Sequence, residues 1–233
     1  MNERLTIFTA PKPFTNPHIA TIQRNAIRSW KALGPDVSVL VIGSEEGIQQ
    51  AAADLGVGWL PEVACNPHGT PFIPALFQAA RQHSTSPLLA YVNADILLLP
   101  DFLAAAERLA AQLPHFLLVG QRWDLDLREP LEFSGLWQAA LRQRLAEDGR
   151  LHPRGGSDYF VFPRACFEQI PGLVVGRAGW DNWMLFEARR RGWALVDGTA
   201  DVWIVHQNHD YSHLPGGQPD RKSTRLNSSH RIR

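Results

Sequence analysis

Cysteine is scarce in this chain of 233 residues, and long apolar runs are missing from it. Its two cysteines, Cys65 and Cys166, do not have the spacing of a metal-binding motif. Two cysteines are too few for a disulfide framework, so we expect a reducing, cytoplasmic setting. No run of about 18 apolar residues predicts a transmembrane helix, and the first residues lack the long apolar stretch of a signal peptide.

An excess of charge of either sign is also missing, because 23 basic residues balance 23 acidic ones. That balance depends on residues 220–233, DRKSTRLNSSHRIR, which hold five of the basic residues and one of the acidic ones. Without this segment 18 basic and 22 acidic residues remain, a net charge of about −4. A balanced or mildly acidic chain gives no support for nucleic-acid binding.

Residues 220–233 resemble a translated sequencing adapter and do not continue the apolar patterning before them. We therefore expect residues 1–219 to form a single domain that lacks its natural C-terminus. Residues 220–233 are then a foreign tail, to be excluded from the fold as a cloning scar would be. A genuine basic tail is the alternative interpretation.

The chain does contain a regular alternation of strand-length apolar runs and helix-length amphipathic segments. Strands are predicted over LTIFT, DVSVLVIG, VGWLPEV, PLLAYVN and HFLLVGQ, with helices between them. The first helix is expected to follow an N-cap at Asn16, and a later one to be capped near Thr70. This βαβα order predicts an α/β fold with a mostly parallel sheet covered on both faces. Such sheets bind ligands beyond the carboxyl ends of their strands.

The composition becomes more polar between Arg122 and Gly156. We interpret this stretch as an insertion or lid beside the site, with one amphipathic helix around residues 131–145. A strand over SDYFVF, a helix over WDNWMLFEARRRG and two late strands, WALVD and ADVWIVH, complete the expected elements.

Asn93 and Asp95 interrupt the apolar run YVNADILLLP where the strand PLLAYV ends. Polar side chains are costly inside a buried strand, so we expect this triplet at the rim of a site. A carboxylate just after a strand suits Mg²⁺ or Mn²⁺, because these ions prefer oxygen ligands and share them with substrate phosphates. A turn in which Asp95 accepts hydrogen bonds from nearby backbone amides is the alternative.

The early βαβ half, the triplet NAD and the segment GRAGWDNWMLFEARRRG together resemble the nucleotide-diphospho-sugar transferases of the glycosyltransferase-A fold, over most of residues 5–219. The resemblance implies a three-layer α/β/α domain that moves a sugar from a nucleotide-diphosphate donor to an acceptor hydroxyl. Asn93 replaces the first Asp of the family's Asp-x-Asp, so Asp95 is the stronger metal ligand and Asn93 offers a neutral carbonyl. WDLD, residues 123–126, also contains Asp-x-Asp but ranks second, because it lies beyond the predicted strand.

The resemblance implies roles for two further residues. Asp181 corresponds to the acidic acceptor-side motif and would act as general base, or position the acceptor if the anomeric configuration is retained. The alternative for Asp181 is a helix N-cap. His206, directly after the last strand, would be a further metal ligand, with His209 second, since neutral imidazole is compatible with manganese. A solvated loop is the alternative for both histidines.

In this fold the loop after the first strand, here FTAPKPF, meets the base and ribose of the nucleotide. Thr9 and Ala10 would offer backbone contacts there, and Lys12 would approach phosphate. Asp158, beside two glycines, is expected to contact the sugar or acceptor. A proline-stiffened surface loop and a simple turn are the respective alternatives. The loop has no G-x-G-x-x-G, which counts against a dinucleotide-binding oxidoreductase.

The sequence therefore favours a glycosyltransferase that uses Mn²⁺ or Mg²⁺, a nucleotide sugar and a hydroxyl acceptor. A nucleotidyltransferase that makes sugar nucleotides is one alternative, but TAPKPF lacks the Gly-rich loop that binds triphosphate. A non-catalytic nucleotide-sugar-binding module is the other, because Asn93 replaces the usual Asp.

Overall fold

The computed structural model describes residues 3–155, 157–177 and 179–209. Residues 220–233, the expected foreign tail, lie outside the described residues. The helices are α1 Pro17–Lys31, α2 Ile48–Leu55, α3 Ile73–Gln82, α4 Pro100–Ala110, α5 Trp137–Asp148 and α6 Trp180–Arg190. The strands are β1 Leu5–Thr9, β2 Val37–Ile42, β3 Gly58–Leu60, β4 Leu88–Val92, β5 Ile96–Leu98, β6 Phe116–Val119, β7 Trp123–Leu125, β8 Arg150–Leu151, β9 Tyr159–Pro163, β10 Ala194–Asp197 and β11 Ile204–Gln207.

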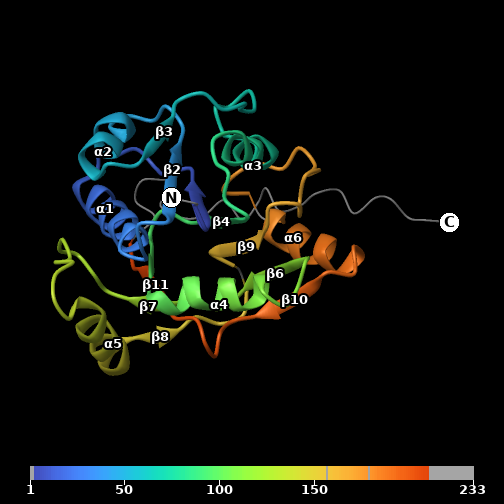
Figure 1. Ribbon diagram of the computed structural model, residues 1–233. Helices are drawn as coiled ribbons and strands as arrows, with labels where there is room; N and C mark the ends of the chain where they lie inside the picture. Colours follow the sequence, from blue (N-terminus) through green and yellow to red (C-terminus); the bar gives the residue numbers. More distant parts are fainter. Residues whose placement is uncertain (1–2, 156, 178, 210–233) are drawn as a thin grey trace.

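The main sheet has seven strands in the order β10-β6-β9-β4-β1-β2-β3 (Figure 1). Its pairings are parallel except those of β9, which runs antiparallel to β4 and β6. Helices pack on both faces of this sheet, α1, α2 and α4 on one and α3 and α6 on the other. The predicted three-layer α/β/α architecture is therefore confirmed.

The alternation of side chains along β1 shows why both faces are covered. Leu5 and Ile7 pack in the cluster that contains α1, α2 and α4, whereas Phe8 packs in the cluster that contains α3 and α6. All three are fully buried. A strand with no polar face needs a helix layer on each side, as strands of parallel sheets usually do.

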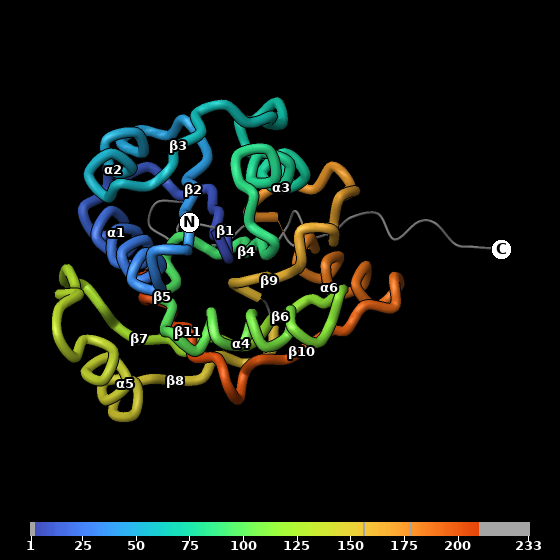
Figure 2. Tube along the Cα trace, viewed as in Figure 1, coloured from blue at the N-terminus to red at the C-terminus, as the bar shows by residue number. Residues whose placement is uncertain are grey.

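A second sheet, β5-β11-β7-β8, was not predicted. It packs against α5 through a separate apolar cluster that includes Leu97, Leu125, Leu141 and Val205. Figure 2 shows α5 and β8 together at the lower left of the view, at the margin of the molecule. The polar stretch that we interpret as an insertion or lid beside the site begins with β7, which pairs with β11 in this second sheet.

Two predicted helix starts are also wrong. The helix expected around residues 131–145 begins at Trp137, and the backbone amide of Leu131 instead donates to Asn25 Oδ1 at 2.9 Å. The helix expected to be capped near Thr70 begins at Ile73. The amide of Thr70 donates to Asn66 Oδ1 in a turn before the helix. The predicted cap of α1 is confirmed, because Asn16 Oδ1 accepts hydrogen bonds from the backbone amides of His18 and Ile19.

None of the described helices is both long and apolar enough to span a membrane. Cys65 is exposed, Cys166 is buried and both are free thiols.

Deleting residues 220–233 should leave the melting temperature unchanged within about 2 °C. A loss of about 1 kcal/mol would move a domain of this size by about 2–4 °C, so thermal unfolding of the two chains side by side resolves any packing of the tail. A clear fall in the melting temperature of the shortened chain would show that the tail belongs to the fold.

Candidate active site and metal centre

A cavity of about 540 Å³ opens at the carboxyl ends of β1 and β4. Seven of the eight side chains that the sequence singled out line it, and they are Ala10, Lys12, Asn93, Asp95, Asp158, Asp181 and His206. The eighth, Thr9, is the last residue of β1 and is fully buried. His209, the second choice among the histidines, lines the same cavity.

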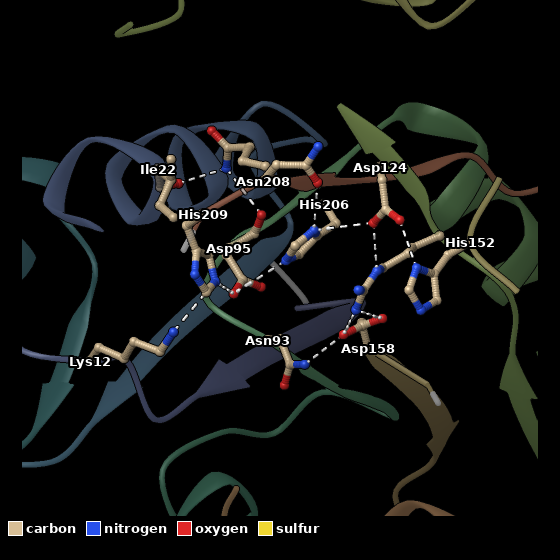
Figure 3. A network of polar contacts seen from close by, with 12 residues as sticks. Lys12, Ile22, Asn93, Asp95, Asp124, His152, Asp158, His206, Asn208 and His209 are labelled. Atoms are coloured by element: carbon tan, nitrogen blue, oxygen red, sulfur yellow. Dashed lines mark hydrogen bonds and ion pairs between the residues drawn. The ribbon is translucent and has the colours of Figure 1, made fainter. Parts of the chain in front are cut away.

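The second sheet assembles one wall of this cavity. Asp95 directly precedes β5, and the antiparallel register of β5 with β11 pairs Ile96 with His206. On the other side of β11, the parallel register with β7 pairs His206 with Asp124. Three segments far apart in the sequence therefore present Asp95, His206 and Asp124 side by side (Figure 3).

Asp95 lies at the centre of a carboxylate–histidine cluster. Its Oδ2 lies 3.2 Å from His209 Nε2 and 3.9 Å from His206 Nε2. Its Oδ1 is buried and has no hydrogen-bond partner among the described residues. Burial on its own would raise the pKa of Asp95, but the hydrogen bond from His209 and the nearby His206 and Lys12 lower it to about 2. The carboxylate is therefore ionised at neutral pH.

His206 uses its two ring nitrogens in different directions. Nδ1 lies 3.2 Å from Asp124 Oδ1 and 3.3 Å from Asn208 Oδ1, while Nε2 faces Asp95. Burial lowers the pKa of His206 below its usual value, against the opposing effect of the Asp95 carboxylate. The ring is thus neutral at pH 7 and carries a lone pair on one nitrogen.

The loop after β1 brings Lys12 to the cluster. The backbone amide of Lys12 donates to Gln23 Oε1 at 2.7 Å, and Gln23 Nε2 donates back to the carbonyl of Lys12 at 3.0 Å. This clamp from α1 holds the loop, and Lys12 Nζ lies 3.4 Å from His209 Nε2. Burial lowers the pKa of Lys12, although Asp95 opposes that shift. Sequence reasoning missed Gln23, whose one signal is a polar residue on the buried face of α1.

Asn93 and Asp158 are bound to each other rather than pointing separately into the cavity. Asn93 Nδ2 donates to Asp158 Oδ1 at 2.9 Å, and Arg122 Nη1 lies 2.9 Å from both oxygens of that carboxylate. Burial would lower the pKa of Arg122, but the carboxylates of Asp158 and Asp124 raise it. Asp158 thus has both oxygens engaged by Arg122, a residue that sequence reasoning did not select.

Asp124, in the lower-ranked WDLD, lies beyond the predicted strand β6, as expected, but on a further strand, β7, that was not predicted. Its Oδ1 accepts from Arg122 Nε at 2.9 Å, and its Oδ2 lies 2.6 Å from His152 Nδ1. Burial would raise the pKa of Asp124, but the contacts with His152 and Arg122 lower it. Asp124 is therefore an ionised neighbour of His206.

Asp181 lies in the first turn of α6 and lines the same cavity. Its Oδ1 accepts from the backbone amides of Asn182 at 2.8 Å and Gly179 at 3.3 Å. The N-cap position itself belongs to Gly179. Asp181 Oδ2 makes no hydrogen bond with a described residue, which leaves that oxygen for a ligand. The preceding Trp180 is buried against Tyr91 and Phe160 and belongs to the core.

The chain was compared with proteins of known structure, and it is similar in fold to several sugar-transferring enzymes. Staphylococcus aureus TarS, residues 1–349, superposes with a TM-score of 0.55 at 11% identity, over 88% of this chain and 60% of TarS. A protein of Desulfovibrio desulfuricans G20 assigned as a nucleotide-diphospho-sugar transferase gives 0.52 at 12% identity, over 84% and 80%. The mannosyltransferase PcManGT of Pyrobaculum calidifontis, solved with GDP-Man and Mn²⁺, gives 0.50 at 17% identity, over 88% and 57%.

These likenesses establish that the chain has a glycosyltransferase-A-like fold. The chain spans about 60% of the solved TarS chain, residues 1–349, and 57% of the solved PcManGT chain. No profile of a known protein family matches the sequence. No curated protein matches it in sequence either.

Proposed function

We propose that this chain transfers a sugar from a nucleotide-diphosphate donor to an acceptor hydroxyl and uses a divalent metal ion. One observation carries the proposal: Asp95, His206 and His209 place ligand atoms within 4.8 Å of one another, in the cavity at the carboxyl edge of the sheet. The neighbours support the donor class, because TarS has been solved with UDP-GlcNAc and PcManGT with GDP-Man.

The residues of this cluster fit a metal ion. Asp95 Oδ1 is a buried charged oxygen without a partner among the described residues, and such a group is costly unless something compensates it. His206 is neutral and offers imidazole nitrogen. A donor set of one carboxylate and two imidazoles suits Mn²⁺ better than Mg²⁺, which prefers oxygen ligands. We therefore favour Mn²⁺, with Mg²⁺ as the weaker alternative.

Asp95, His206 and His209 would hold the ion, and Asn93 is the weaker candidate because its amide nitrogen is bound to Asp158. When bound, the ion offsets the negative charge that develops on the leaving nucleoside diphosphate. The ammonium group of Lys12 lies beside the cluster and would contact the same phosphates. We place the base and ribose against the backbone of Ala10, at the start of the loop that Gln23 clamps, because Thr9 is fully buried and does not line the cavity.

Asp181 would act on the acceptor side. In an inverting reaction its Oδ2 accepts the proton of the acceptor hydroxyl as the hydroxyl oxygen bonds to the anomeric carbon, and the bond from that carbon to the diphosphate breaks. In a retaining reaction the same carboxylate positions the acceptor. Asp158 would contact the sugar while it remains paired with Arg122.

Incubation with UDP-GlcNAc, GDP-Man and related nucleotide sugars in the presence of Mn²⁺ should release free nucleoside diphosphate. The release should be larger with an acceptor sugar present and should stop with EDTA. Binding of the nucleotide sugar, seen as thermal stabilisation, without any release would instead indicate a binding module. Pyrophosphate release from a nucleoside triphosphate and a sugar phosphate would indicate a nucleotidyltransferase, and either result would overturn the proposal.

A further inference from the structure

Two oxygen atoms converge on the Nδ1 atom of His206. One belongs to the Asp124 carboxylate at 3.2 Å, and the other is Asn208 Oδ1 at 3.3 Å. The orientation of the Asn208 amide follows from its other contact, since its Nδ2 donates to Asp126 Oδ1 at 2.9 Å. Neither oxygen facing Nδ1 can donate a proton, so the hydrogen atom lies on Nδ1 of the ring.

The Asp124 carboxylate is itself held from several directions. Arg122 Nε donates to its Oδ1, and His152 Nδ1 lies 2.6 Å from its Oδ2. The register of β7 with β11 places its backbone directly opposite that of His206 (Figure 3). Arg122 also binds Asp158, so it links the Asp124 carboxylate to a second carboxylate that lines the cavity.

One arginine balances the carboxylate charges near His206. Arg122 lies between the carboxylates of Asp124 and Asp158 and offsets their charge. A neutral ring with Nδ1 protonated has its lone pair on Nε2, the atom that faces Asp95.

We infer that Asp124 is a positioning residue, which holds His206 in the Nδ1–H tautomer and so presents the Nε2 lone pair to a divalent ion beside Asp95. Metal-binding histidines commonly donate their other ring N–H to a carboxylate or carbonyl, and losing that partner lowers metal affinity by about 10- to 100-fold. The inference rests on the metal site of the proposed function. It does not rest on sugar transfer.

The first measurement uses the metal-free protein. Long-range ¹H–¹⁵N correlation spectra report which ring nitrogen carries the proton, and the His206 signals are identified by their loss in His206→Gln. We expect the Nδ1–H tautomer in the unsubstituted protein. A spectrum of the Nε2–H tautomer would overturn the inference whatever the variants show.

The second measurement compares variants by titration with Mn²⁺ alone. Asp124→Leu removes the charged acceptor and should weaken Mn²⁺ binding about 10- to 100-fold, with a mixture of His206 tautomers in the spectra. Asp124→Asn keeps an oxygen toward Nδ1 and should recover both the tautomer and most of the affinity. Asn208→Ala removes the oxygen that forms the hydrogen bond with Nδ1 at 3.3 Å. It should have a smaller effect than Asp124→Leu, because the charged Asp124 oxygen at 3.2 Å attracts the Nδ1–H more strongly than a neutral oxygen does.

Asp148→Ala serves as the matched control, since it removes one exposed carboxylate at the end of α5. Unchanged tautomer and affinity in folded Asp124→Leu would overturn the inference while leaving the metal site intact. If Asp124→Leu does not fold, the Asn variant and the spectrum of the unsubstituted protein decide. If neither the unsubstituted protein nor any variant binds Mn²⁺, the proposed metal dependence is wrong. The tautomer spectra still show whether Asp124 positions His206.

Discussion

Replacing Asp95 by alanine will abolish Mn²⁺-dependent binding of the nucleotide sugar. Asp95 is the one carboxylate in its cluster with two histidines, and its Oδ1 is buried without a partner among the described residues. Loss of a group that merely supports a ligand weakens metal binding up to about 100-fold, so loss of the ligand itself should cost at least that factor. Titration calorimetry with donor, with and without Mn²⁺, measures the effect.

The same experiment needs a check that Asp95→Ala is folded. The side chain borders the cavity, and the side chains of His209 and Lys12 that face it can be solvated from the cavity, so the melting temperature should change little. Asp95→Asn keeps the size of the side chain and should lose metal-dependent binding as well, whereas Asp148→Ala should retain it. If Asp95→Ala binds the donor in Mn²⁺ as tightly as the unsubstituted chain, the triplet Asn93-Ala94-Asp95 is only a turn.

The position of Asp95 could be predicted because it depends on local pattern. A polar residue at the end of a fully apolar strand indicates the carboxyl edge of a parallel sheet, and β4 ends at Val92 as expected. His206 could be found for the same reason, although the strand that precedes it belongs to the second sheet. Local patterning therefore predicted which segments approach the cavity.

The partners of these residues could not be predicted, because they depend on which strands pair. The sequence of the short strand β7 does not indicate that it pairs with β11, so the motif that contains Asp124 was ranked second. Arg122 was not selected at all. It forms ion pairs with Asp124 on β7 and with Asp158 just before β9, and the sequence does not show that these two residues are neighbours. The start of α3 shifted for a similar reason, because Phe72 pairs with Val174 and cannot join the helix.

Replacing Asp181 by asparagine should separate donor binding from transfer. Asp181 Oδ1 accepts from the amide of Asn182, and an asparagine oxygen can accept the same bond. The free energy of unfolding should therefore fall by less than about 1 kcal/mol. Donor binding should persist, because Asp181 is not a member of the cluster formed by Asp95, His206 and His209.

Transfer by Asp181→Asn should fall about 100-fold or more, since an amide cannot take the acceptor proton and a positioned general base contributes about 10²- to 10⁴-fold. Calorimetry with donor and a transfer assay on one preparation measure both quantities, with Asn182→Ala in the same exposed turn as control. A fall in kcat at unchanged acceptor KM indicates a base, and a raised acceptor KM at unchanged kcat indicates a positioning role. Near-normal transfer would remove Asp181 from the chemistry, and a loss of stability without a kinetic effect would leave it as a residue that stabilises the start of α6.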